Sequence, residues 1–374
     1  MIVVHFPSWF PFAGRPHHGN FILRQIEAAG AHTTAIVLHH IDDDFDEAPL
    51  STFQNIHFQP IKVPKEISKI KLFSAYCTAF QQIIKKYGKP DLIHLHVALP
   101  LGPIAAFLSR KHNIPLAISE HWSVYKPVNR ENLSLVQKIL LRFSFQTASG
   151  ITTVSDDLHQ AIVDTFPFTR KTYFKQISNV VNTNLFTPSF QASTFDKKQI
   201  LHISTLDNAA KNIMGILRTI LNLSKERNDF IFNIIHDISN TEVEDFIQDN
   251  QLTDFVHLLG EKSEAEVARY IQESAFLLLF SNYENQPCVL LEAFCCGKPA
   301  ITTPVGGIPE VADTHNAVFV EPRNEDELAS KIRYMLDNHQ LFDSSSIRQK
   351  AEHLYSSETI GQLFYSTYKT ILQK

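Results

Sequence analysis

The sequence predicts an α/β protein built from two doubly wound domains. Short runs rich in β-branched and aromatic residues alternate with amphipathic stretches along the whole chain. The alternation restarts near residue 199, after a stretch with little periodic signal. The length of 374 residues also favours two domains of ordinary size over one.

The β-rich runs are read as strands of parallel sheets, because amphipathic stretches of helical spacing separate them. The strands expected in the first half are 2–6, 34–38, 91–97, 116–119 and 151–154. Those expected in the second half are 199–203, 230–235, 255–258, 276–280, 300–302 and 317–320. Helices are expected, among other places, over 19–29, 74–87 and 133–147.

The stretch 179–198 contains Pro188 and is read as a linker between the domains. The sequence thus predicts an N-terminal domain over 1–182, a C-terminal domain over 183–355 and a last helix over 356–374. Apolar residues at helical spacing show that this helix packs on one of the domains, and the N-terminal domain is one candidate. Ligands of doubly wound sheets bind at the carboxyl ends of the strands, so the site is expected in the cleft between the domains.

Composition excludes several classes of protein. Hydrophobic residues make up 44% of the chain and charged residues 20%, which is typical of a soluble globular protein. The net charge of −5 gives no attraction for nucleic acid. The start of the chain resembles a strand and not a signal peptide, and no apolar run approaches the ~18 residues of a membrane span. We therefore expect a cytoplasmic protein.

The most informative stretch runs from Phe276 to Val311. A buried strand is followed by a polar turn, and Pro287 suits the first turn of a short apolar helix over 288–296. Gly297 suits the left-handed position that ends this helix. A helix N-terminus at the end of a parallel strand favours phosphate oxygens, so the sequence predicts an anion site there.

Two glutamates frame that site. Glu284 lies on the turn at the strand end, and Glu292 follows eight positions later on the helix. With a nucleotide diphosphate at the helix N-terminus, one carboxylate can reach the sugar and the other the ribose. The pair, the helix, the next strand and the loop at Gly306 and Gly307 together resemble the nucleotide-sugar motif of glycosyltransferase family 4.

The resemblance implies the GT-B fold, with two Rossmann-like domains facing a central cleft, and sugar transfer that retains the anomeric configuration without a metal ion. The segment from His202 through Lys211 resembles the first strand of the C-terminal domain and its phosphate-binding turn. Thr205 stands where the family usually carries an arginine, so Lys211 carries the phosphate charge alone or shares it with Lys262 or Arg15.

In the N-terminal half, two predicted strands resemble the family's strands that end in histidine. His121 matches the histidine beside the donor sugar, whereas His94 is read as structural and His96 lies nearer its strand end. A loop with Gly14 and Gly19 resembles the family's glycine loop. It differs from the family's in carrying Arg15, His17 and His18, which could contact an anionic acceptor or simply be solvated.

The expected site residues follow from these matches. The catalytic residues are expected to be Glu284, His121 and Lys211. The donor-binding residues are expected to be Glu292, Gly19, Thr205, Asn285, Pro287, Cys288, Val289, Leu290, Gly306 and Gly307. No metal ligand and no cofactor beyond the donor are expected, and the acidic run 42–47 is read as a solvated loop.

The sequence thus predicts a hexosyltransferase that moves a sugar from a nucleotide-sugar donor to an envelope glycan or glycolipid. Two alternatives stay open: a UDP-sugar 2-epimerase of the same fold, and a nucleotide-sugar-binding protein without activity. Lysines at 62, 65, 69, 71, 85, 86 and 89 fit contact with anionic lipid at the cytoplasmic membrane surface, and equally an ordinary exposed helix face.

Overall fold

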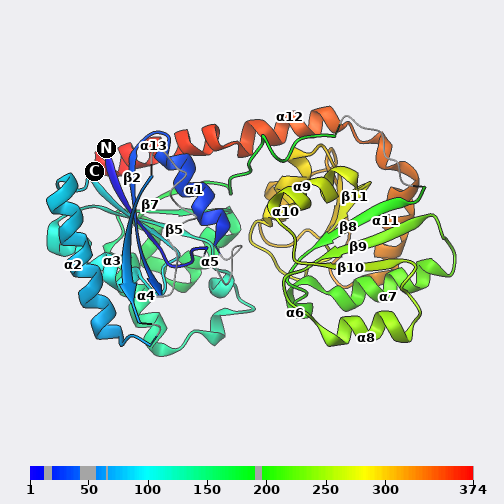
Figure 1. Cartoon of the computed structure of the whole chain (residues 1–374), viewed down its shortest axis with the longest axis horizontal. Helices are drawn as coiled ribbons and strands as arrows, with labels where there is room; N and C mark the ends of the chain where they lie inside the picture. The colour runs from blue at the N-terminus through cyan, green and yellow to red at the C-terminus, as the bar shows by residue number, and fades with distance from the viewer. Residues whose placement is uncertain (12–18, 43–55, 65, 190–195, 374) are drawn as a thin grey trace. The chain divides into compact units, whose positions relative to one another are not determined.

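The structure is a computed structural model, and it describes residues 1–11, 19–42, 56–64, 66–189 and 196–373 (Figure 1). The described chain divides into two compact units. Unit 1 comprises residues 1–180 and 357–374, and unit 2 comprises residues 181–356. None of the described helices is long and apolar enough to cross a membrane.

Unit 1 is a parallel sheet of seven strands in the order β3-β2-β1-β4-β5-β6-β7. Its strands are β1 Ile2–Pro7, β2 Thr34–Asp42, β3 Ile56–Val63, β4 Leu92–His96, β5 Leu116–Glu120, β6 Gly150–Thr153 and β7 Tyr173–Gln176. Its helices are α1 Asn20–Gly30, α2 Lys69–Tyr87, α3 Gly102–His112, α4 Leu135–Thr147, α5 Asp156–Thr165 and α13 Ser357–Leu372. The strand order reverses between β1 and β4, as in a doubly wound fold.

Alternation along the strands divides the core of unit 1 between the two faces of the sheet. Val4 and Phe6 of β1 pack with α2, α3, α4 and α5, whereas Val3 packs with α1 and α13. Successive side chains of a strand point to opposite faces, so one buried strand supplies both cores. The C-terminal helix α13 lies against α1 and belongs to unit 1.

Unit 2 is a parallel sheet of six strands in the order β10-β9-β8-β11-β12-β13. Its strands are β8 Lys198–Ile203, β9 Phe230–Ile235, β10 Val256–Gly260, β11 Phe276–Leu278, β12 Ala300–Thr302 and β13 Ala317–Phe319. Its helices are α6 Asn208–Lys211, α7 Ile213–Ser224, α8 Thr241–Asp249, α9 Glu264–Glu273, α10 Cys288–Cys295, α11 Glu325–Asn338 and α12 Ser344–Tyr355. The order reverses between β8 and β11.

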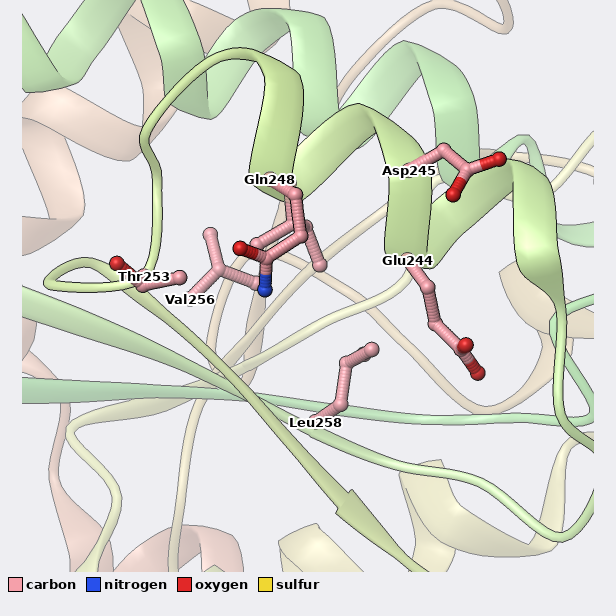
Figure 2. Close-up of a pocket in the computed structure, with 7 residues that line it drawn as sticks. Glu244, Asp245, Gln248, Thr253, Val256 and Leu258 are labelled. Atoms are coloured by element: carbon pink, nitrogen blue, oxygen red, sulfur yellow. The ribbon is translucent and has the colours of Figure 1, made fainter.

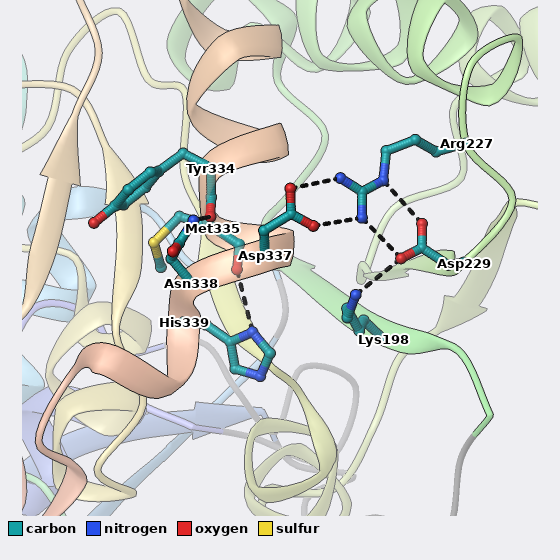
Figure 3. Close-up of polar contacts among 8 residues, drawn as sticks. All are labelled: Lys198, Arg227, Asp229, Tyr334, Met335, Asp337, Asn338 and His339. Carbon is teal, nitrogen blue, oxygen red and sulfur yellow. Dashed lines mark hydrogen bonds and ion pairs between the residues drawn. The ribbon is translucent and has the colours of Figure 1, made fainter.

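An ionic network fastens the amino ends of β8 and β9 to α11 (Figure 3). The Arg227 guanidinium donates to both carboxylate oxygens of Asp229, at 2.9 and 2.8 Å, and to both of Asp337, at 3.0 and 2.7 Å. Lys198 adds a third donor to Asp229 at 2.9 Å. These cations hold the pKa of the Asp229 carboxyl below its usual range. The network lies at the edge opposite the carboxyl ends of the strands.

The short helix α10 is bracketed by residues that suit its two ends. The sequence predicts Pro287 in the first turn of this helix. In the structure Pro287 is the N-cap residue, directly before the first turn. Gly297 takes the left-handed conformation with φ 70°, and the amide N–H of Lys298 donates to the Ala293 carbonyl at 2.9 Å. This is the Schellman arrangement, which satisfies carbonyls at a helix end.

Candidate functional site

The carboxyl ends of β8 and β11 meet at the point where the strand order of unit 2 reverses. Ligands of doubly wound sheets bind at this position because the connections leave the two ends in opposite directions and open a crevice. The segments that follow the two strands carry Lys211 and Glu284, which the sequence predicts to be catalytic.

Lys211 and Glu284 form an ion pair between Nζ and Oε1. Their side chains are 20% and 10% exposed, so the pair is largely shielded from water and is screened less than a surface pair. Local structure fixes the lysine. Asp207 caps the one-turn helix α6 by accepting from the Ala209 amide at 3.0 Å, and Lys211 is the last residue of α6.

The loop after β11 is tied to α6, and this tie brings the glutamate to the lysine. The amide N–H of Asn282 donates to the Ala210 carbonyl at 2.7 Å, and its side-chain amide donates to the Ala209 carbonyl at 3.0 Å. Ser281 is fully buried and donates from Oγ to Glu284 Oε1 at 2.9 Å. One oxygen of Glu284 therefore accepts from both Lys211 and Ser281.

Ser281 and its neighbours were not among the residues predicted from the sequence. Thr303, just past β12, donates to the Ser281 carbonyl at 2.7 Å and so holds the loop from the next strand. His202 on β8 is buried, with Nδ1 2.8 Å from the Leu278 carbonyl and Nε2 2.8 Å from Ser204 Oγ. Burial lowers the pKa of His202 to about 4, so the ring is neutral at pH 7. Polar residues at the ends of neighbouring buried strands were the signal that could have found them.

Helix α10 follows directly and carries most of the predicted donor-binding residues. Cys288, Val289 and Leu290 form its first turn, and the amide N–H of Leu290 donates to the Pro287 carbonyl at 3.1 Å. The amide N–H groups of a first turn form the positive end of the helix dipole. Glu292 is the fifth residue of α10 and is 5% exposed. A carboxylate this deep needs polar partners, and Glu292 makes polar interactions within the fold.

The remaining predicted residues of unit 2 differ in exposure. Asn285 is half-buried and Pro287 is buried beside the start of α10. Gly306 adopts a left-handed conformation with φ 57°, and Gly307 is the N-cap of a 3-10 turn over Ile308–Glu310. Thr205 is exposed, and the Nζ of Lys262 donates to the Leu259 carbonyl at 2.6 Å.

In unit 1, the carboxyl end of β5 carries Glu120 and His121. Glu120 is fully buried and accepts four hydrogen bonds: from the amides of Ala98, His121 and Trp122 and from the Tyr125 hydroxyl, at 2.8–3.0 Å. Burial raises the pKa of Glu120, and the hydrogen bonds oppose this rise. Glu120 thus fixes the backbone of His121, and it is a positioning residue that was not among those predicted from the sequence.

His121 itself is half-buried, with Nε2 3.1 Å from Gln25 Oε1 and its ring 4.9 Å from that of Phe21. Burial lowers the pKa of His121 to about 3, so it is a neutral hydrogen-bonding group at pH 7. Gly19 is the N-cap of α1 with φ 76°, and a Cβ there would come within 2.7 Å of the Trp9 backbone. Gly14, Arg15, His17 and His18 lie outside the described residues, as does most of the acidic run 42–47.

Three buried histidines of unit 1 lie together: His5 on β1 with His94 and His96 on β4. Their ligand atoms are within 4.8 Å of one another, close enough for a metal ion. Both ring nitrogens of His94 are, however, already hydrogen-bonded, to the Tyr368 hydroxyl and to Ser119 Oγ, each at 2.7 Å. In this form His94 joins β4 to α13 and β5, which agrees with a structural role.

A pocket of about 430 Å³ lies elsewhere in unit 2, between α8 and β10 (Figure 2). Glu244, Asp245 and Gln248 line it from the helix, and Thr253, Val256 and Leu258 from the strand and the segment before it. It contains none of the predicted site residues. Two carboxylates on one wall do not suit a nucleotide diphosphate, because like charges repel.

Comparison with known proteins agrees with the predicted class. Residues 22–185 match the family model for Glycosyltransferase Family 4, and residues 197–338 match that for Glycosyl transferases group 1. An uncharacterized glycosyltransferase of Methanocaldococcus jannaschii is 29% identical over 309 residues, which cover 79% of this chain and 80% of the relative. The N-acetyl-alpha-D-glucosaminyl L-malate synthase of Bacillus anthracis is 21% identical, covering 76% and 75% of the two chains.

Solved structures share the whole architecture. The sucrose-phosphate synthase of Thermosynechococcus elongatus has a TM-score of 0.79 at 17% identity, with 100% of both chains covered. HepE of Anabaena, solved in complex with UDP, has a TM-score of 0.78 at 19% identity and covers 99% of this chain and 100% of its own. These neighbours have the GT-B fold, so the predicted fold class of two Rossmann-like domains is confirmed. The two family models match consecutive parts of the chain. The chain therefore belongs to the glycosyltransferases of the group 1, or family 4, type.

Proposed function

We propose that this glycosyltransferase moves a hexose from a nucleoside diphosphate sugar to an envelope glycan or a lipid-linked acceptor, with retention and without a metal ion. The cluster of Lys211, Glu284 and the start of α10 at the strand ends of unit 2 carries the proposal. The relatives support the substrate class. One is a putative teichuronic acid biosynthesis glycosyltransferase of Bacillus subtilis, 25% identical over 65% of this chain and 60% of its own length, and HepE was solved with UDP-glucose.

The proposed donor site places the diphosphate between Lys211 and the first turn of α10. Departure of the nucleotide builds negative charge on the β-phosphate, and a fixed ammonium group and helix N–H groups stabilise that charge. Glu292, the buried carboxylate on α10, is assigned to the ribose hydroxyls. A carboxylate accepts from two neighbouring hydroxyls, which suits a ribose.

Lys211 changes partners in this scheme. In the structure its ammonium group is held by Glu284, and an ammonium has three donors. The arriving phosphate takes one or more of these donors and weakens the hold on Glu284. The carboxylate, still oriented by Ser281, then accepts from the hydroxyls of the donor sugar.

In unit 1, we assign His121 to a hydrogen bond with the donor sugar. We assign Gly19 to a position where the ligand comes close to the backbone. His121 is neutral because burial lowers its pKa to about 3, so it can donate or accept a hydrogen bond without placing a second charge beside the sugar. The proposed step breaks the bond between the anomeric carbon and the β-phosphate oxygen. The acceptor hydroxyl attacks on the same face, and its proton passes to the departing phosphate.

A second candidate rests on Thr205. It is exposed at the position where the resemblance expects an arginine, so Lys211 carries the phosphate charge with less help. The absence of an arginine at this position would fit a protein that binds the nucleotide sugar but does not turn it over.

The test is an assay of the full chain with a panel of UDP-, GDP- and ADP-sugars, with and without EDTA. We expect hydrolysis or transfer with at least one donor, unaffected by EDTA. Binding without turnover would support the second candidate. Absence of binding with every donor would contradict the proposed donor site, and activity lost in EDTA and restored by Mg²⁺ would contradict metal independence.

A further inference from the structure

Three helices of unit 1, α2, α3 and α4, form one layer on the sheet. α3 packs against both α2 and α4, and all three bury apolar residues in the same core (Figure 1). Their opposite sides are therefore the outer surface of this layer. We name this surface the basic face.

The basic face carries charges of one sign. The sequences of α2, α3 and α4 contain no Asp or Glu. Their exposed basic residues are Lys69, Lys71, Lys85, Lys86, Arg110, Lys111, Lys138 and Arg142. In a chain of net charge −5 this separation is notable, because helices α8 and α9 of unit 2 carry more acidic than basic residues. The face attracts an anionic partner.

Apolar side chains stand out from the same face. On α4, Leu135 is 74% exposed, Val136 65% and Ile139 58%, and on α2 Ile70 is 82% exposed. Val128, which is 61% exposed, lies in the segment before α4. Leu135 and Val136 precede Ile139 by four and three positions, so both neighbour it on the helix surface. An exposed apolar group rimmed by charge indicates an interaction site.

Lys138 and Arg142 lie one turn apart on α4, beside this aliphatic group. A helix that offers aliphatic side chains with lysine and arginine next to them matches the pattern of interfacial membrane helices. The apolar groups enter the boundary between headgroups and acyl chains, and the cations meet anionic headgroups. We propose that the basic face docks unit 1 on an anionic lipid bilayer, with Leu135, Val136 and Ile139 as the inserted side chains.

Two other partners fit the face less well. A nucleic acid would meet the cations, but protruding aliphatic side chains offer it neither stacking nor hydrogen bonds. A second copy of the chain would place like charges against each other, because a symmetric contact pairs a surface with itself. A bilayer matches both the charge and the apolar groups.

Docking there has a consequence for the proposed function, on which this step rests. Helices between parallel strands begin at the carboxyl edge of the sheet, so the first turn of α4 lies at the same edge as His121. A bilayer that receives Leu135 and Val136 would thus present a lipid-linked acceptor at the edge of unit 1 that carries the proposed catalytic histidine.

The test is co-sedimentation of the full chain with phosphatidylcholine vesicles, with and without about 30 mol % phosphatidylglycerol, at physiological ionic strength. We expect binding only to the anionic vesicles, weakened by added salt. The triple variant Leu135→Ser, Val136→Ser and Ile139→Ser should bind about tenfold or more weakly, as should Lys138→Glu with Arg142→Glu.

The matched control is Ile238→Ser with Leu341→Ser, two apolar residues of unit 2 that are 58% and 74% exposed. This variant should bind as the wild type does. Equal binding by the triple variant and the wild type, or no binding to anionic vesicles, would overturn the proposal. Two further results would overturn it. Light scattering could show a dimer of the wild type that the triple variant does not form, or the wild type could bind RNA tightly and lose this binding only in the charge variant.

Vesicle binding and donor turnover are separate readouts. Hydrolysis of a nucleotide sugar in solution tests the donor site without a membrane, so failure of one proposal leaves the other standing.

Discussion

Lys211 and Glu284 are 73 positions apart in the sequence and meet through one ion pair. At the scale of single residues, this contact places a cation where the β-phosphate is proposed to bind. The strand-end motif predicts both residues individually. Their contact could not be predicted from the sequence, since it requires β8 and β11 to be neighbours in the sheet and the Asn282 bonds to α6.

Replacing Lys211 with alanine should weaken the donor complex about 10- to 100-fold, because a hydrogen bond to a charged group contributes about 1.5–3 kcal/mol. The measurement is donor KM and kcat for the purified variant. Lys225→Ala, at an exposed lysine that caps the far end of α7, is the control and should leave both constants unchanged. Unchanged kinetics for the Lys211 variant would mean that the phosphate binds elsewhere.

The histidines whose pKa is lowered in the fold predict how stability depends on pH. Burial lowers the pKa of His5 and His121 to about 3 and of His202 to about 4, whereas an unfolded histidine has a pKa of about 6.5. As the pH falls below about 6.5, the unfolded chain takes up protons that the folded chain does not. The free energy of unfolding should therefore be highest above pH 6.5 and fall toward pH 4.

The measurement is urea unfolding between pH 7 and pH 5. Most carboxyl groups titrate near pH 4, so they contribute little to the change in this range. Each buried histidine adds a slope of up to about 1.4 kcal/mol per pH unit. His5→Gln should remove one such contribution, and the exposed His315→Asn should not. Stability that is constant or rises as the pH falls would contradict the neutral state of these rings.

At the scale of elements, the buried strands and both edge strands of unit 2 were predictable, whereas the two edge strands of unit 1 were not. The predicted ranges 230–235 and 300–302 coincide with β9 and β12. The strands β3 and β7 form the two edges of the unit 1 sheet and were missed. β3 contains Pro60 and Lys62 and β7 is four residues long, so neither gives the continuous apolar run of a central strand.

The start of helix α2 was placed late, because its first turn is exposed. α2 begins at Lys69 after the N-cap Ser68, five positions before the predicted start. Lys69, Ile70 and Lys71 are all exposed, so they show no buried stripe from which a helix could be read. In contrast, Pro287 and Gly297 bracket α10, and its extent was predicted to within one residue.

The end of α10 offers a test of the element that positions Glu292. A Cβ on Gly297 would meet Ser344 Oγ at 2.2 Å and the Ser344 carbonyl at 2.7 Å, at a φ of 70°. Gly260 has a similar φ of 67° but nothing within 4 Å of an added Cβ. Gly260→Ala should therefore lose about 1–2 kcal/mol from the left-handed backbone alone, and Gly297→Ala should lose clearly more.

Urea unfolding of the two variants separates backbone strain from crowding. Equal losses would show that the contact of Gly297 with α12 does not constrain the end of α10.

At the scale of the whole molecule, the chain leaves unit 1 after Val180 and returns to it at Ser357. The returning helix α13 buries Ile360, Phe364 and Tyr368 in the core of unit 1, and its Tyr368 hydroxyl bonds His94. The C-terminal helix is thus part of the core of the N-terminal sheet. The spacing of its apolar residues predicted that the helix packs on a domain but did not identify which one. Such spacing shows that one face of a helix is buried, and it carries no information about the surface that covers this face.

Removing residues 357–374 should therefore destabilise unit 1 and leave unit 2 folded. Hydrogen exchange is the measurement: protection should fall in β1, β4 and β5 and persist in β8, β9 and β11. A chain shortened only by Gln373 and Lys374 is the control, since these residues follow the end of α13. Loss of protection in unit 2, or full protection in unit 1, would contradict this division of the core.

The overall architecture persists at 17–19% identity to solved GT-B structures, so the pattern of strands, helices and strand-end loops specifies the fold with little shared sequence. The proposed chemistry depends on the few residues at the strand ends. The proposed function requires that the nucleotide binds at the carboxyl edge of unit 2, with Glu292 as its ribose ligand.

Calorimetric titration with the nucleoside diphosphate of the preferred donor measures this binding. We expect the wild type to bind, Glu292→Ala to bind at least about tenfold more weakly while still unfolding in one cooperative urea transition, and Glu244→Ala, in the pocket at α8, to bind as the wild type does. Wild-type affinity in Glu292→Ala, or a loss confined to Glu244→Ala, would contradict the claim and place the nucleotide elsewhere.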